Sequence, residues 1–208
     1  MPDHGYSAAD IQVLEFDESV RARPGMYFGV GRENAALATE VLGSVLVHAL
    51  HPAARLAPTH TPRVHAEVFA DLAFAVADDQ AGLAGDGGIP RLGYHGSLLG
   101  TDRWLLAAAA AVSARVIVEV WRDGRGHCQE LSGLRPVTMP QEFDAPPGSG
   151  TKVTFELDRI YFGPDAAITS DLNALDLHGP YCTDPPGPGR VTIRDLRRGN
   201  DSDTISHS

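Results

Sequence analysis

The chain has 208 residues, 43% of them hydrophobic, which is enough for one sizeable core. Its 27 acidic and 17 basic residues give a net charge of −10, which disfavours a nucleic-acid-binding surface, because such a surface needs clustered Lys and Arg. Two cysteines are too few for a disulfide framework or a four-ligand zinc site. The sequence lacks a signal peptide and any apolar run near the ~20 residues of a membrane span, so we expect a cytoplasmic protein with no membrane partner.

Hydrophobic periodicity predicts two helices and a hairpin in the first part of the chain. In chain order these are a helix over 8–21, a helix over 34–51, and strands over 64–69 and 72–77. Pro24 ends the first helix and Pro52 the second, because proline cannot continue a helix.

The second part of the chain begins with a Gly-rich passage, 82–100, which has no periodicity and is expected to be a long functional or mobile loop. The elements predicted after it are an Ala-rich helix over 101–113, strands over 116–121 and 127–131 joined by a turn at Asp123-Gly124, a loop over 133–149, a strand over 151–157, a short helix over 169–177 and a strand over 190–196. Residues 199–208 are polar and are expected to form a disordered tail.

Hairpins outnumber strand–helix–strand units in this pattern. The pattern favours an α+β fold over a doubly wound parallel sheet: a two-layer sandwich with helices on one face of a mixed sheet. We expect one domain over residues 1–198. No Gly-x-Gly-x-x-Gly motif follows a strand and no Walker A motif is present, so the usual phosphate-binding loops are missing.

Four segments carry a resemblance to a known family. The core of the first, Val20-Arg-x-Arg-Pro-Gly-Met-Tyr27, belongs to a longer string over 11–27 that closely resembles the first helix of the ATPase domains of DNA gyrase B and topoisomerase IV. The other three resemble later family motifs in the same order; they are Thr39–Leu42, Val76–Leu83 and Gly150–Phe155. The resemblance runs from Tyr6 to Arg198 and implies the Bergerat fold of the GHKL superfamily. We expect a stand-alone domain, without the transducer and DNA-cleaving domains of gyrase B.

The resemblance implies a ligand-binding set. Asp78 matches the carboxylate that accepts a hydrogen bond from the adenine amino group, and Thr151 matches a threonine that binds adenine through water. Gly82 follows the acid in the same motif. Arg122 matches the arginine that aminocoumarin antibiotics contact. Each also has an ordinary structural alternative, such as a strand-end cap, a strand threonine or a rim arginine.

The implied catalytic set is altered. Glu40 matches the general base that polarises the attacking water, a task that suits a carboxylate. Ser44 stands where the family has the asparagine that holds magnesium, and Gly43 precedes it in place of Asp. No metal site is therefore assigned, and ATP with magnesium is expected to bind weakly if at all, because magnesium supplies several kcal/mol of stabilisation.

A further change affects a pair of positions. The family has a helix Glu that meets an Arg just after the adenine carboxylate, and this chain has His48 and Ala81 there. Glu40, Ser44 and His48 lie at i, i+4 and i+8 on one helix face, so they could perform acid–base or acyl-transfer chemistry. The alternative is drift of an unused site.

The phosphate-wrapping motif has two placements. Gly93-Tyr-His95-Gly96 keeps its beginning but requires seven extra residues, whereas the ungapped placement aligns Gly100–Leu105 with the motif. We favour the ungapped placement, in which Asp102 lies near the phosphates and repels them. In both placements this chain lacks some of the family's glycines, whose backbone N–H groups would close on the phosphates.

These expectations combine into three functions. The first is a degenerate GHKL domain, a pseudoenzyme that binds a nucleotide or small ligand without efficient hydrolysis and acts as a regulatory or partner-binding module. The second is an enzyme of specialised metabolism that uses the remodelled pocket on a small non-nucleotide substrate, and the third is a slow magnesium-dependent ATPase. Residues 1–10 are expected to form an N-terminal arm. Tyr6 and Ile11 match the family's arm, which crosses between the protomers of gyrase B dimers, so either homodimerisation or local packing is expected.

Overall fold

The computed structural model describes residues 13–50, 62–80, 90–177, 190–197 and 204–207. The helices are α1 (Phe16–Ala22), α2 (Gly25–Phe28), α3 (Leu37–Leu50), α4 (Trp104–Ala111) and α5 (Arg159–Phe162). Three 3₁₀ turns are η3 (Tyr94–Gly96), η4 (Thr101–Arg103) and η5 (Leu172–Ala174). The strands are β1 (Arg63–Ala70), β2 (Ala73–Asp78), β3 (Ser113–Arg122), β4 (Arg125–Ser132), β5 (Arg135–Pro136), β6 (Gln141–Asp144), β7 (Ser149–Leu157), β8 (Arg190–Asp195) and β9 (Thr204–His207).

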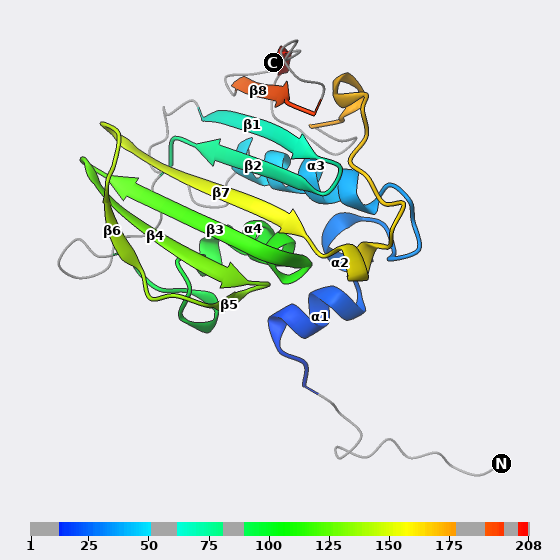
Figure 1. Cartoon of the computed structure of the whole chain (residues 1–208), viewed down its shortest axis with the longest axis horizontal. Helices are drawn as coiled ribbons and strands as arrows, with labels where there is room; N and C mark the ends of the chain where they lie inside the picture. Colours follow the sequence, from blue (N-terminus) through cyan, green and yellow to red (C-terminus); the bar gives the residue numbers. More distant parts are fainter. Residues whose placement is uncertain (1–12, 51–61, 81–89, 178–189, 198–203, 208) are drawn as a thin grey trace.

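All these strands belong to one mixed sheet, ordered β5-β4-β3-β7-β2-β1-β8-β9, with β6 also paired to β4. The pair β1–β8 is parallel and the other pairs are antiparallel. Helix α3 packs against β1, β2 and β8, and α4 packs against β3 and β7 (Figure 1). The expected α+β architecture, with helices packed on a mixed sheet, is confirmed.

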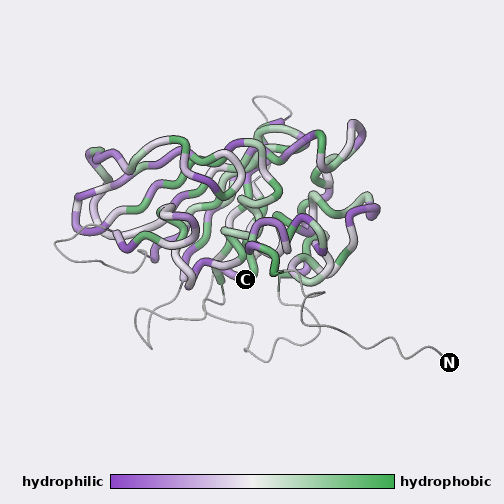
Figure 2. Tube along the Cα trace, turned by 90° about the horizontal axis from the view of Figure 1, so that it is seen from below, coloured by the Kyte–Doolittle hydropathy of each residue, from purple (hydrophilic) through white to green (hydrophobic). Residues whose placement is uncertain are grey.

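The core lies between the sheet and these two helices. On β1, Val64, Ala66 and Val68 are buried and alternate with more exposed residues, as expected for a strand with one covered face. Every residue of α4 after Trp104 is buried, and the alanine run 107–111 lets this helix lie close to the strands. Hydrophobic segments accordingly gather in the middle of the molecule, and hydrophilic ones mark the hairpin ends (Figure 2).

Helix α1 is fixed at one end of this helical layer. Glu15 and Glu18 form a capping box that satisfies backbone N–H groups at its start. Arg21 then donates to the Asp158 carboxylate at 2.8 Å and to the carbonyl of Ala111 at 3.1 Å, which ties α1 to the end of α4. Among the described residues, no helix is long and apolar enough to cross a membrane.

The structure corrects three local predictions. The tail expected to be disordered contains β9, which pairs with β8 and places Ile205 beside Ile193. The helix expected over 169–177 is reduced to the 3₁₀ turn η5. The loop expected over 133–149 contains β5 and β6, two short strands that pair with β4. In each case pairing or packing with distant residues decides the conformation, which local composition does not report.

Candidate functional site

The site begins where β2 ends and β7 begins. These strands are antiparallel neighbours, and their register places Asp78 directly opposite Thr151. Both side chains lie on the helix-facing side of the sheet, where Asp78 continues the row of Phe74 and Val76. Asp78 is 6% exposed and Thr151 3% exposed, so each needs hydrogen-bond partners inside the protein.

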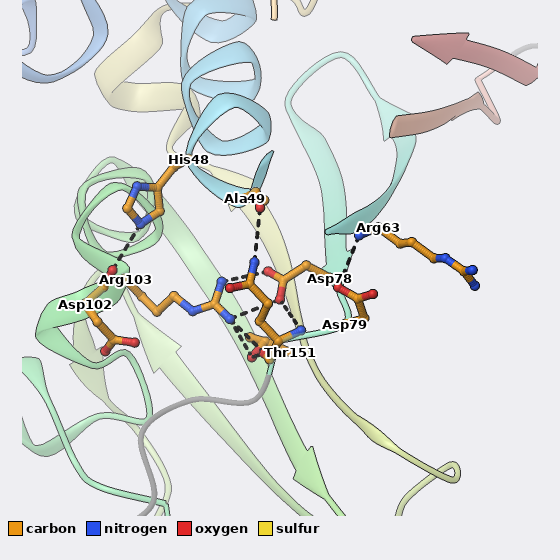
Figure 3. A network of polar contacts seen from close by, with 9 residues as sticks. His48, Ala49, Arg63, Asp78, Asp79, Asp102, Arg103 and Thr151 are labelled. Atoms are coloured by element: carbon orange, nitrogen blue, oxygen red, sulfur yellow. Dashed lines mark hydrogen bonds and ion pairs between the residues drawn. The ribbon is translucent and has the colours of Figure 1, made fainter. Parts of the chain in front are cut away.

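The main partner of Asp78 is Arg103, the last residue of η4. Its Nη1 donates to Oδ2 of Asp78 at 2.7 Å and its Nη2 to Oδ1 at 3.0 Å, a two-point ion pair. The same Nη2 lies 2.7 Å from the carbonyl oxygen of Gln80 and 3.4 Å from Oγ1 of Thr151. Figure 3 shows the Arg103 side chain reaching from the start of α4 to Asp78 and Thr151. We call these acceptors, from Asp78, Gln80 and Thr151, the Arg103 site.

The acceptors are themselves held in place. The Thr151 hydroxyl donates to the carbonyl oxygen of Gln80 at 2.8 Å, and the Gln80 backbone N–H donates to Oδ1 of Asp78 at 2.9 Å. The Gln80 side chain, 3% exposed, donates to the carbonyl of Ala49 at 3.2 Å and so ties this strand end to the last turn of α3. The Arg103 site is thus rigidly connected to both layers of the fold.

Burial raises the pKa of the Asp78 carboxyl, and the charge and hydrogen bonds of Arg103 oppose that rise. The carboxylate and the guanidinium are only 3% and 7% exposed at their side chains. A buried pair of this kind depends on both members, because either charge alone would lack compensation in a water-poor environment.

The helix face expected to carry catalysis lies on α3. His48 is 6% exposed, its Nε2–H donates to the carbonyl of Asp102 at 3.1 Å, and its ring packs edge-on against Trp104. Burial lowers the pKa of His48 and so favours the neutral ring, and the carbonyl acceptor requires a proton on Nε2. Within the described residues no hydrogen bond joins Ser44 to Glu40 or to His48, and the catalytic roles of all three stay predictions.

The two candidate phosphate segments lie in different places. Residues 93–96 form η3, a tight turn in which the Gly93 N–H donates to the Ser97 carbonyl at 2.7 Å, and His95 contacts Asp17 of α1 at 3.3 Å. The segment 100–105 is the one that reaches Asp78, through Arg103. Oδ1 of Asp102 is buried and has no hydrogen-bond partner within the described part of the chain.

The remaining predicted residues do not take part in the Arg103 site as described. Arg122 is exposed at the end of β3, beside the turn in which Asp123 and Gly124 take positive φ angles of 52° and 80°. This turn confirms the one expected from sequence. Gly82, Ala81, Tyr6 and Ile11 lie outside the described residues.

The donor set does not fit a magnesium nucleotide. At the position of the metal-binding amide, α3 offers the Ser44 hydroxyl next to Gly43, whereas Mg²⁺ is usually held by carboxylates together with phosphate oxygens. Adenine does not fit either while Arg103 is bound, since the guanidinium uses both oxygens of Asp78.

Sequence reasoning missed Arg103 and Gln80. The changes to Ala81 and His48 gave no signal for Asp78, because the family's Arg and Glu at these positions pair with each other. One signal was available at Arg103 itself. Arg103 directly precedes an apolar, Ala-rich helix, a position where a basic residue enters the interior only with a partner.

Comparison with known proteins supports the resemblance. The chain is 35% identical over 183 residues to the B subunit of DNA topoisomerase 4 from Caulobacter vibrioides, a match that covers 76% of this chain and 25% of that protein. It is 29% identical over 203 residues to the mitochondrial DNA gyrase B of Arabidopsis thaliana, a match that covers 82% of this chain and 26% of that protein. It is 28% identical over 203 residues to the DNA gyrase B of Synechocystis, where the match covers 86% of this chain and 17% of that protein. No family model matches the chain. The chain therefore spans about a quarter or less of the relatives it matches, and these homologues support a GHKL ATPase-type domain.

Proposed function

We propose that this gyrase B-like GHKL domain does not hydrolyse ATP efficiently and serves as a regulatory or partner-binding module with a remodelled ligand pocket. The observation that carries the proposal is the two-point ion pair between Arg103 and Asp78. It places a side chain of the protein itself on the carboxylate that, by resemblance, would recognise adenine.

The second support is the loss of groups that stabilise charge on a transferred phosphate. Positioned cations and backbone N–H donors supply most of the catalysis in phosphoryl transfer. Here Ser44 replaces the metal-binding amide, and Asp102 brings a carboxylate to the segment aligned with the phosphate loop. Glu40 keeps the carboxylate of a general base, but a base alone does not compensate for the missing charge stabilisation.

The test is ATP binding and turnover by the purified chain. We expect phosphate release in the presence of ATP and magnesium to match that of the Glu40→Gln variant, which keeps the size of the side chain and removes its basicity. We also expect calorimetry to show no magnesium-dependent gain in ATP affinity.

The contrary result is clear. Phosphate release well above background that Glu40→Gln abolishes would establish a working ATPase and reject the proposal. Ser44→Asn serves as the matched gain-of-ligand control: with Arg103 still on Asp78, restoring the amide alone is expected to leave turnover at background.

A further inference from the structure

The Arg103 site consists of acceptors that match a forked cation. It presents both carboxylate oxygens of Asp78, the Gln80 carbonyl and the Thr151 hydroxyl, and each lies within 3.4 Å of a terminal guanidinium nitrogen. A guanidinium is planar and carries donors in fixed directions, so it can meet several acceptors at once, whereas an ammonium group acts as a point charge. The arrangement of these acceptors therefore suits a guanidinium or amidinium group.

The charge of the site also favours a cationic ligand. Asp78 is buried, and the adjacent Asp79 adds a second negative charge that acts on it. A neutral purine that displaced Arg103 would leave the Asp78 carboxylate buried without a countercharge, which costs several kcal/mol. A cationic ligand that displaced Arg103 would preserve the ion pair.

Two other ionisable groups lie near the site, and neither supplies a countercharge to Asp78. The carboxylate of Asp79 adds negative charge beside Asp78. His48 donates to the Asp102 carbonyl and burial lowers its pKa, and Arg103 is the cation that directly contacts Asp78 in the described part of the chain. Its removal leaves the Asp78 carboxyl group without a countercharge.

We propose that the Arg103 site binds ligands that carry a guanidinium or amidinium group, and that such a ligand displaces Arg103. The inference rests on the proposed function, since it names the ligand class of the same pocket. In the ligand-free protein Arg103 is a tethered competitor, whose effective concentration is about millimolar or more. Ligand binding would release Arg103 together with η4, whose Asp102 carbonyl is bonded to His48.

The experiment uses the Arg103→Ala variant and small probes. Methylguanidinium, ethylguanidinium and acetamidinium should raise its melting temperature in a saturable way, while methylammonium, adenine and adenosine should have little effect. The wild-type protein should need at least about tenfold more of each cation, because Arg103 competes.

Two control variants test whether the rise in melting temperature comes from binding at the Arg103 site. The double variant Asp78→Asn/Arg103→Ala should lose the response to all three cations. Arg115→Ala, which frees the exposed carboxylates of Glu130 and Glu156, should show no saturable response, because exposed ion pairs are weak.

The proposal is overturned if adenine or adenosine stabilises Arg103→Ala as well as the cations do, or if the double variant responds equally. Should Arg103→Ala fail to fold, NMR of the wild-type protein decides. The Arg103 guanidinium signal, identified by its contacts with Thr151, should shift towards that of a solvent-exposed arginine with ethylguanidinium and stay unchanged with adenosine. The reverse pattern rejects the proposal.

These outcomes are independent of the ATPase test. Preference for purines with no phosphate release would reject the ligand class and leave the proposed function standing. Turnover that depends on Glu40 would reject the proposed function whatever the probes show.

Discussion

Arg103 and Asp78 are separated by 25 residues in sequence and form a two-point ion pair in the interior, with nitrogen–oxygen distances of 2.7 and 3.0 Å. The pair joins η4, at the start of α4, to the end of β2, and thus links the helical layer to the sheet. Because both side chains are buried, the loss of one partner should cost more than the net stability that the intact pair provides.

Arg103→Met should lower the free energy of unfolding by about 3–5 kcal/mol, since it keeps the length of the aliphatic stem but leaves Asp78 without its cation. Urea unfolding followed by circular dichroism measures this change. Arg115→Met is the matched control, because Arg115 also contacts two carboxylates but its side chain is 43% exposed. Equal losses from the two substitutions would mean that Arg103 is not buried in an ion pair.

The stability lost in Arg103→Met should shrink as the pH falls. Without the guanidinium, only the Gln80 backbone N–H still opposes the rise that burial causes in the pKa of Asp78. The folded variant then binds a proton more readily than its unfolded chain, so its stability decreases as the pH rises from about 4 through the folded pKa. Unfolding curves of both proteins between about pH 4 and 8 test this. A difference that stays constant with pH would show that Asp78 remains ionised in the variant.

His48 should titrate below its ordinary pKa of 6.5, because burial disfavours the imidazolium. Its folded pKa is depressed, so the stability contributed by neutral His48 should be present above the unfolded value and lost as the pH falls through the folded one. Heteronuclear NMR of the ring should also show the proton on Nε2, bonded to Asp102. A raised pKa, or a proton on Nδ1 alone, would contradict this geometry.

Local patterns are sufficient to predict most of the framework. The hairpin of β3 and β4 is predictable with its turn because β-branched residues flank Asp123-Gly124, and both turn residues adopt the left-handed conformation that such a turn requires. Helix α3 follows from its apolar spacing. Strands β5, β6 and β9 escape prediction, because they are two to four residues long and depend on neighbours far along the chain.

The site is predictable only in part. The resemblance identifies Asp78 and Thr151, and the structure brings them together across β2 and β7. It gives no partner for Asp78, because Arg103 comes from a different segment of the chain. Arg103 stands in the segment aligned with the phosphate loop, and nothing in its sequence neighbourhood indicates that its charge meets Asp78. A buried countercharge is a property of three-dimensional packing, which sequence spacing does not reveal.

Gly150→Ala tests the strand beside the Arg103 site. The Trp121 side chain lies against Gly150, and a methyl group there would collide with the indole and approach the backbone oxygen of Asp78 at 2.8 Å. We expect a loss of stability of about 1–3 kcal/mol, the usual cost of overpacking. Because the chain has two tryptophans, the fluorescence of the Trp104→Phe background reports Trp121 alone, and its emission should shift to longer wavelength as the indole is displaced.

Gly43→Ala should change the stability of the protein in the opposite direction. Gly43 lies inside α3 with no atom within 4 Å of an added Cβ, so alanine should stabilise the protein by up to about 1 kcal/mol through helix propensity. Thermal and urea unfolding of the two variants in the same background measure both effects. If Gly150→Ala were neutral and left the Trp121 emission unchanged, the close packing of this indole on β7 would be wrong.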